Sequence, residues 1–195
     1  PFIEKIRDEV GVTILYVSHA IEEVIRLADR MIVLSDGQVA AQGPVEEIMS
    51  RLDLHPLTGR FDAGAVIATK FAHYDAAYGL GELEFPGGRL QVASLDMAKG
   101  TALRAHIRAR DVSLMIEKPR GTSVLNVFKG RISGVREEDG PQIDLSIDVG
   151  VTLIARVTRK SLETLRLRVG SEVYAMVKAV AIDRRSVSVT KERTR

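Results

Sequence analysis

Several features that define whole classes of protein are missing from this 195-residue sequence. It has no cysteine, which excludes disulfide bonds and thiolate metal sites and fits a reducing compartment. Tryptophan is absent and aromatic residues make up only 5% of the chain, whereas single-strand nucleic-acid binders stack bases on exposed aromatic side chains. The formal net charge is only +2, so the basic excess typical of nucleic-acid-binding proteins is missing too.

Long apolar runs are also missing. The most apolar segment, Val173 to Ile182, is interrupted by Lys178 and is shorter than the roughly 20 residues that a membrane-spanning helix needs. The chain starts with Pro1 inside an expected helix and has no basic-then-apolar signal-peptide pattern, so we expect a fragment of a longer protein. The histidines show no metal-ligand spacing, and no metal site is expected.

The first 53 residues have the pattern of an α/β unit. Ile3, Ile6 and Val10 recur at helical spacing, and Gly11 ends the predicted helix. The run from Val12 to Val17 is continuously apolar and β-branched, which is typical of a strand buried on both faces of a parallel sheet.

A helix, a hairpin and a second helix are predicted next. Apolar residues recur at helical spacing from Ile21 to Ala28. Asp36-Gly37 separates two apolar runs and predicts a two-residue hairpin turn, and Gly43-Pro44 opens a short helix. We take residues 1–53 as one unit and residues 54–64 as a linker.

The remainder predicts small β-barrels. Short alternating runs are separated by glycine turns, and one helix is expected near residues 159–167. Residues 100–109 align with residues 170–179 at an offset of 70 residues, although chance similarity between two strands after a glycine turn is an alternative. We therefore expect two related five-stranded barrels of the OB type, at residues 65–120 and 121–192.

An ordered series of short motifs surrounds His19. The motifs are Tyr16-Val-Ser-His-Ala20, Glu22-Glu-Val24, Leu27-Ala-Asp-Arg30, Met31-Ile-Val-Leu34, Asp36-Gly-Gln38 and Gly43-Pro44. The series resembles the end of the nucleotide-binding domain of ABC-transporter ATPases. The resemblance implies that His19 is the switch histidine, which would hydrogen-bond the ATP γ-phosphate and hold the attacking water. Without it, a lone histidine after a strand would be read as a structural hydrogen-bonder.

The catalytic set of that family is incomplete here. The sequence has no G-x-x-x-x-G-K-[ST] loop to hold phosphates, no family signature motif and no Asp-Glu pair for Mg²⁺. ATP and Mg²⁺ would therefore be cofactors of a full-length subunit, and we expect no hydrolysis by this chain alone. ATP-saturable hydrolysis by the purified chain would contradict this.

The β part carries a second resemblance. Its motifs are Thr122-Ser-Val-Leu-Asn126, Lys129-Gly-Arg-Ile132, Ala155 to Ser161 and Val169 to Ala179. They resemble the molybdate-binding mop (TOBE) domain, and the whole chain resembles the C-terminal part of the ATP-binding subunits of molybdate ABC importers (ModC type). The resemblance implies bound molybdate or tungstate, a homodimer, a transmembrane permease partner and a cytoplasmic location on the inner face of the membrane.

Molybdate is a tetrahedral dianion, so its site needs hydrogen-bond donors and cations rather than acceptors. Candidate donors in the matching motifs are Ser123, Asn126, Thr158, Ser161 and Lys178. The segment from Thr158 to Ser161 also lies where the predicted helix begins and exposes free N–H groups. Each residue has an ordinary alternative: a helix cap, a turn residue or a solvated strand lysine.

One position departs from the family. Leu125 stands where free-standing mop domains often have arginine, which leaves Lys178 as the main cation and Arg156 as a possible substitute. Because sites in this family lie between mop units, a single copy is expected to offer half-sites. Two other functions stay open: an importer tail for another cargo (sugar, polyamine or ferric ion), and an OB-fold nucleic-acid binder.

Overall fold

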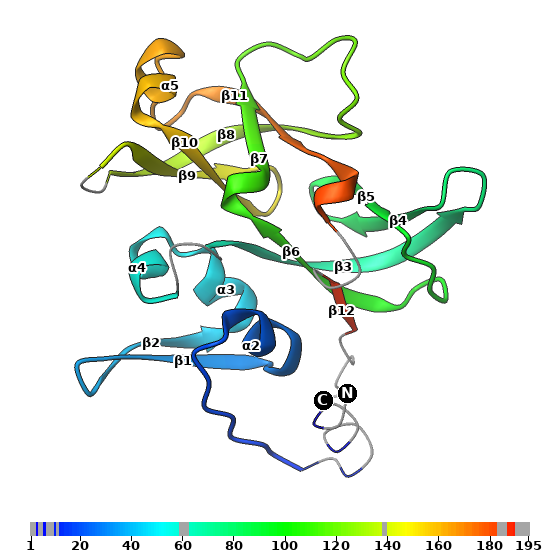
Figure 1. Cartoon of the computed structure of the whole chain (residues 1–195), viewed down its shortest axis with the longest axis vertical. Coiled ribbons are helices and arrows are strands. Elements are labelled where there is room, and N and C mark those ends of the chain that lie inside the picture. Colours follow the sequence, from blue (N-terminus) through cyan, green and yellow to red (C-terminus); the bar gives the residue numbers. More distant parts are fainter. Residues whose placement is uncertain are drawn as a thin grey trace.

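The computed structural model describes residues 3, 6, 10, 12–58, 63–137, 140–182 and 187–189. The helix predicted at residues 3–10 falls almost wholly outside them. The described chain has a small α/β part and two curled five-stranded antiparallel sheets (Figure 1). The expected fold class, an α/β remnant followed by OB-like β structure, is confirmed.

The α/β part is a hairpin covered by two helices. Its elements are α2 (Ile21–Leu27), β1 (Arg30–Ser35), β2 (Gln38–Pro44) and α3 (Val45–Ser50). Asp36 and Gly37 both have positive φ, at 51° and 76°, as the two-residue turn predicted from sequence requires. Ile48 and Met49 are fully buried, and Val66 of the neighbouring sheet joins the same apolar cluster. The α/β part is therefore packed onto the β structure rather than tethered to it.

The prediction of a buried strand at residues 12–17 is wrong for this structure. Residues 12–18 form no strand, and the side chains of Leu15 and Val17 are 86% and 89% exposed. All strand pairs among the described residues are antiparallel, so this run has no parallel neighbour to cover it.

The first sheet has the strand order β12-β6-β3-β4-β5, and the second has the order β10-β9-β8-β11-β7. The strands of the first are β3 (Gly64–Asp75), β4 (Leu80–Phe85), β5 (Gly88–Ala93), β6 (Ala102–Arg108) and β12 (Val187–Val189). Those of the second are β7 (Val112–Met115), β8 (Asn126–Glu137), β9 (Gln142–Asp148), β10 (Thr152–Thr158) and β11 (Glu172–Val177). The short helices are η1 (Leu52–Leu54), α4 (His55–Thr58), η2 (Ala109–Asp111), α5 (Arg159–Thr164) and η3 (Ala179–Ala181).

The two halves of the β part exchange strands. The unit β6-η2-β7 recurs as β11-η3-β12, and η2 at residues 109–111 matches η3 at residues 179–181 at the offset seen in the sequence. After η2 the chain leaves the first sheet, and β7 pairs with β11 of the second. After η3 it returns, and β12 pairs with β6 of the first. The two sheets are therefore interlocked, although the predicted boundary at residue 120 divides the chain once.

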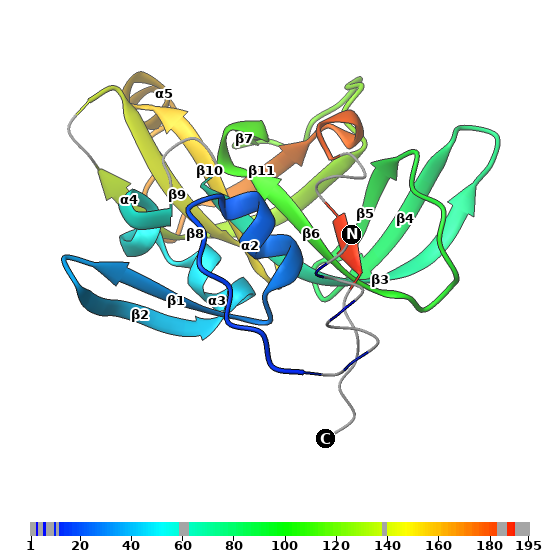
Figure 2. The same cartoon turned by 60° about the horizontal axis from the view of Figure 1, so that its bottom comes forward.

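The two sheets share one apolar core, and Figure 2 shows them side by side. Phe85 of the first sheet meets Phe128 of the second edge to face, with ring centroids 5.3 Å apart. Their side chains are only 8% and 6% exposed. Both rings are core residues, and neither offers a face to a nucleic-acid base.

Candidate oxyanion site and the segment around His19

The five predicted donors form two groups at opposite ends of the twelve-residue strand β8. Asn126 begins β8 and pairs with Val177, the residue before Lys178, while Ser123 lies three residues upstream. Thr158 pairs with Gln142, at the end where β9 meets the last residues of β8. One copy therefore brings together Ser123, Asn126 and Lys178, and separately Thr158 and Ser161.

Ser123 and Lys178 are both exposed. Among the described residues, neither the Ser123 hydroxyl nor the Lys178 ammonium group has a hydrogen-bond or ion-pair partner. Thr122 bends the segment, because its Oγ1 accepts a hydrogen bond of 3.1 Å from the Val124 amide. Leu125, where the family often has arginine, is 52% exposed on this surface. A cation and a hydroxyl are therefore free to meet an anion here.

Asn126 has a structural task that its sequence position does not reveal. Its side chain is 2% exposed. Oδ1 accepts a hydrogen bond from the Gln91 amide at 2.7 Å, and Nδ2 donates one to the Gln91 carbonyl at 3.0 Å. The Asn126 side-chain amide thus bonds both backbone groups of Gln91, as a neighbouring strand would, and links β8 of the second sheet to β5 of the first. Only its second Nδ2 hydrogen is left for an anion.

Thr158 and Ser161 form a helix cap, one of the alternatives considered for them. Thr158 has extended backbone angles, and its Oγ1 accepts a hydrogen bond of 3.0 Å from the Ser161 amide. The two hydroxyl oxygens are 2.8 Å apart and hydrogen-bonded. Thr158 is exposed and Ser161 half-buried, so both hydroxyls keep a solvent-facing side.

A buried ionic cluster of His55, Asp144 and Arg156 was missed from the sequence. Arg156 grips the Asp144 carboxylate with two hydrogen bonds, Nε to Oδ1 at 2.6 Å and Nη2 to Oδ2 at 2.7 Å. His55, in the predicted linker, lies with Nδ1 2.9 Å from Asp144 Oδ2. Burial alone would raise the pKa of Asp144, but the hydrogen bonds from Arg156 and His55 outweigh it and lower the pKa to about 2.

Arg156 and His55 both have structural partners in this cluster. Arg156 pairs with Asp144 and is therefore not a free substitute for the arginine that is missing at position 125. His55 joins α4 to β9 through Asp144. Close by, Arg136 Nη1 donates a hydrogen bond of 2.8 Å to the Leu52 carbonyl. Asp144 of β9 lies directly opposite Arg156 of β10. Opposite charges on neighbouring strands are a signal from which this pair could have been predicted. Nothing local in the sequence points to His55.

His19 is exposed, in the irregular segment before α2. Glu23 of α2 holds the residues around it. Its Oε2 accepts hydrogen bonds from Tyr16 Oη at 2.7 Å and Ser18 Oγ at 3.3 Å. The Ala20 amide donates to Ser18 Oγ at 3.0 Å. The hydrogen bond from Tyr16 is the main cause that lowers the pKa of Glu23, so this carboxylate stays an acceptor at neutral pH.

The described residues contain no group of three or more metal-ligating side chains. No described helix is both long and apolar enough to cross a membrane.

Residues 122–183 match the family model of the TOBE domain. In fold, the chain is similar to a crystal structure of the cytoplasmic molybdate-binding protein ModG with molybdate bound. The TM-score is 0.55 at 21% identity, over 64% of this chain and 95% of that one. The β part thus has the architecture expected for such a domain.

Nearly the whole chain is similar to proteins named molybdenum import ATP-binding protein ModC. It is 44% identical to the one from Mesorhizobium japonicum over 185 residues. The aligned region covers 94% of this chain and 50% of that protein. It is 43% identical to the one from Aromatoleum aromaticum, over 93% of this chain and 48% of that protein. The chain therefore spans about half the length of these relatives and corresponds to their C-terminal part, so the resemblance stated from the motifs is confirmed.

Proposed function

We propose that this chain is the oxyanion-binding tail of the ATP-binding subunit of a molybdate or tungstate ABC importer. The similarity to molybdenum import proteins, at 44% identity over 94% of the chain, is the observation that supports it most. It favours a molybdenum oxyanion over the other cargoes that the first 50 residues allow. The free Ser123 hydroxyl and Lys178 cation on one exposed surface have the chemistry that such an anion needs.

The anion site we propose lies between two copies. A single donor group offers one cation and few hydroxyls, while a desolvated dianion needs donors around its four oxygens. The Ser123–Lys178 group of one copy and the Thr158–Ser161 group of a second would supply both halves of the shell. A twofold dimer then carries two identical sites.

The rest of the machinery belongs to the longer subunit. There, ATP and Mg²⁺ would be bound by segments outside this sequence, and His19 would reach the γ-phosphate. A homodimer of such subunits would work on a transmembrane permease from the cytoplasmic face of the membrane. Tungstate has nearly the size and charge of molybdate and is expected to bind as well, whereas sulfate is smaller and should bind more weakly.

Calorimetric titration of the chain with molybdate, tungstate and sulfate tests this function. Lys178→Met should weaken molybdate binding roughly 10-fold or more, because it removes a charged hydrogen-bond donor. Lys99→Met is the matched control, since Lys99 is an exposed lysine on a turn of the first sheet. If the titration shows no binding heat with molybdate, tungstate or sulfate, the result would favour an importer tail for another cargo.

A further inference from the structure

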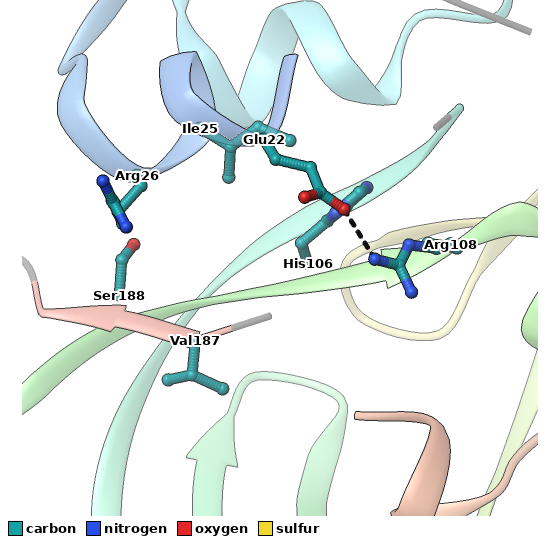
Figure 3. A pocket seen from close by; sticks show the side chains of 7 residues that line it. All are labelled: Glu22, Ile25, Arg26, His106, Arg108, Val187 and Ser188. Atoms are coloured by element: carbon teal, nitrogen blue, oxygen red, sulfur yellow. Dashed lines mark hydrogen bonds and ion pairs between the residues drawn. The ribbon is translucent and has the colours of Figure 1, made fainter. Parts of the chain in front are cut away.

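Helix α2, which follows the switch-histidine segment, lies along one face of strand β6. Arg104, His106 and Arg108 alternate along β6 and so point to the same side of the sheet. In Figure 3, His106 and Arg108 on β6 face Glu22 and Ile25 on α2, and Arg26 lies near Ser188 of β12. The small pocket between these three elements is therefore lined mainly by charged and polar side chains.

Both ends of α2 are held by arginines of this one strand. Near the start of the helix, Arg108 Nη2 lies 2.6 Å from Glu22 Oε1. At its end, Arg104 Nη1 donates to the Ala28 carbonyl at 2.7 Å. Four residues of strand span about 13 Å and a seven-residue helix about 10 Å, so the two arginines match the length of α2.

Arg104 anchors this arrangement in the core. Its side chain is 8% exposed, and its Nε donates to Glu46 Oε1 of α3 at 2.5 Å. A buried guanidinium with several acceptors has one defined position. Strand β12 pairs with β6 at this point, with Ser188 opposite Arg104. The surface on which α2 rests is therefore formed by β6 of the first sheet and by its neighbour β12.

The helix in turn holds the residues on both sides of His19. Glu23 accepts the hydrogen bonds of Tyr16 and Ser18, and the Ala20 carbonyl accepts from the Glu23 and Val24 amides at 3.1 and 3.2 Å. A continuous set of contacts thus runs from β6 through α2 to the backbone around His19.

We infer that Arg104 and Arg108 of the first sheet are positioning residues for the switch histidine. Arg108 acts through Glu22 and Arg104 through the Ala28 carbonyl, so that together they hold α2, and Glu23 of this helix holds the residues around His19. The inference rests on the proposed function, because His19 has a γ-phosphate to meet only in an ABC-type subunit. It adds a task for the first sheet, which carries none of the proposed oxyanion donors: it fixes the direction from which His19 enters the nucleotide site.

Nuclear magnetic resonance on the 195-residue chain, without nucleotide or anion, tests the inference. The measured quantities are the amide exchange of α2, the backbone order of residues 16–20 and the imidazole signals of His19. Arg108→Gln should speed α2 amide exchange about two- to fivefold, as expected for a partly exposed ion pair, and should lower the order at His19. Arg89→Gln is the control, because Arg89 pairs with Glu82 on the same sheet and does not touch α2.

Variants of Glu23 separate positioning from stability. Glu23→Ala removes both acceptor bonds and should disorder residues 16–20, while Glu23→Gln keeps an acceptor oxygen and should restore the wild-type signals. Amides of β8 and β9 should exchange as in the wild type in all these variants. If Arg108→Gln does not fold, Arg108→Lys, which keeps the charge, should give a smaller shift of the same kind.

Unchanged order and unchanged His19 signals in both Arg108→Gln and Glu23→Ala would overturn the inference. Equal changes across α2 and the sheets would also overturn it, because they would mean a merely structural role. A failed molybdate titration would leave these results as they are, so the two proposals fail separately.

Discussion

Asp144 is a buried carboxylate whose charge is balanced within the second sheet, and it gives the sharpest test of the packing described above. Its side chain is 5% exposed, and Arg156 and His55 supply three hydrogen bonds of 2.6 to 2.9 Å. An ionised carboxylate only accepts, so His55 Nδ1 carries the hydrogen. The folded-state pKa of about 2 lies below the ordinary value of 3.8.

The size and sign of the effect follow from this difference. A carboxyl whose pKa is depressed on folding stabilises the fold above its unfolded pKa, and the contribution is lost as pH falls through the folded value. The depression corresponds to about 2 kcal/mol. It should be fully present above about pH 5 and lost on going down to pH 2.

Urea denaturation of the wild type and of Asp144→Asn from pH 6 to pH 2 measures this contribution. Asparagine cannot ionise, so the difference in unfolding free energy should shrink by about 2 kcal/mol across that range. Arg156→Met at pH 7 should cost about 3 kcal/mol or more, because it leaves a buried charge without its main partner. A difference between wild type and Asp144→Asn that stays constant with pH would refute the reasoning.

Three further predictions concern single side chains. Asn126→Ala leaves the Gln91 amide and carbonyl unpaired and should lower the free energy of unfolding by about 2 kcal/mol in a urea melt. The role of Asn126 as an anion ligand is tested separately, by molybdate titration of the same variant. Gly37→Ala places a Cβ at φ 76° and should cost about 1 kcal/mol in the same assay, with no clash because nothing lies within 4 Å. Leu125→Arg adds a second cation beside Lys178 and should tighten molybdate binding several-fold by calorimetry, with a steeper salt dependence; unchanged affinity would place the anion elsewhere.

What the sequence predicts well is local or repeated. The Asp36-Gly37 turn fixes its hairpin because both residues tolerate positive φ. The aligned segments that begin at Gly100 and Gly170 anticipate two strand–3₁₀–strand units, because the same short pattern meets the same physical constraints twice.

What it predicts poorly depends on distant partners. The run from Val12 to Val17 has the composition of a buried strand, but burial on both faces needs neighbours that the described residues do not supply. Asn126 looks like an anion ligand in its motif, yet its hydrogen bonds go to Gln91, 35 positions away. His55 finds Asp144 across 89 positions, a pairing that no local pattern encodes.

An oxyanion site shared between two copies is tested most directly by mixing two defective variants. Lys178→Met removes the cation of one group and Ser161→Ala a donor of the other, so each variant alone should bind molybdate weakly. In an equal mixture with random dimer formation, roughly one site in four combines two intact groups and should regain wild-type affinity by calorimetry. If the mixture shows only the weak molybdate binding of its two separate variants, with no high-affinity sites, the result would contradict the shared site.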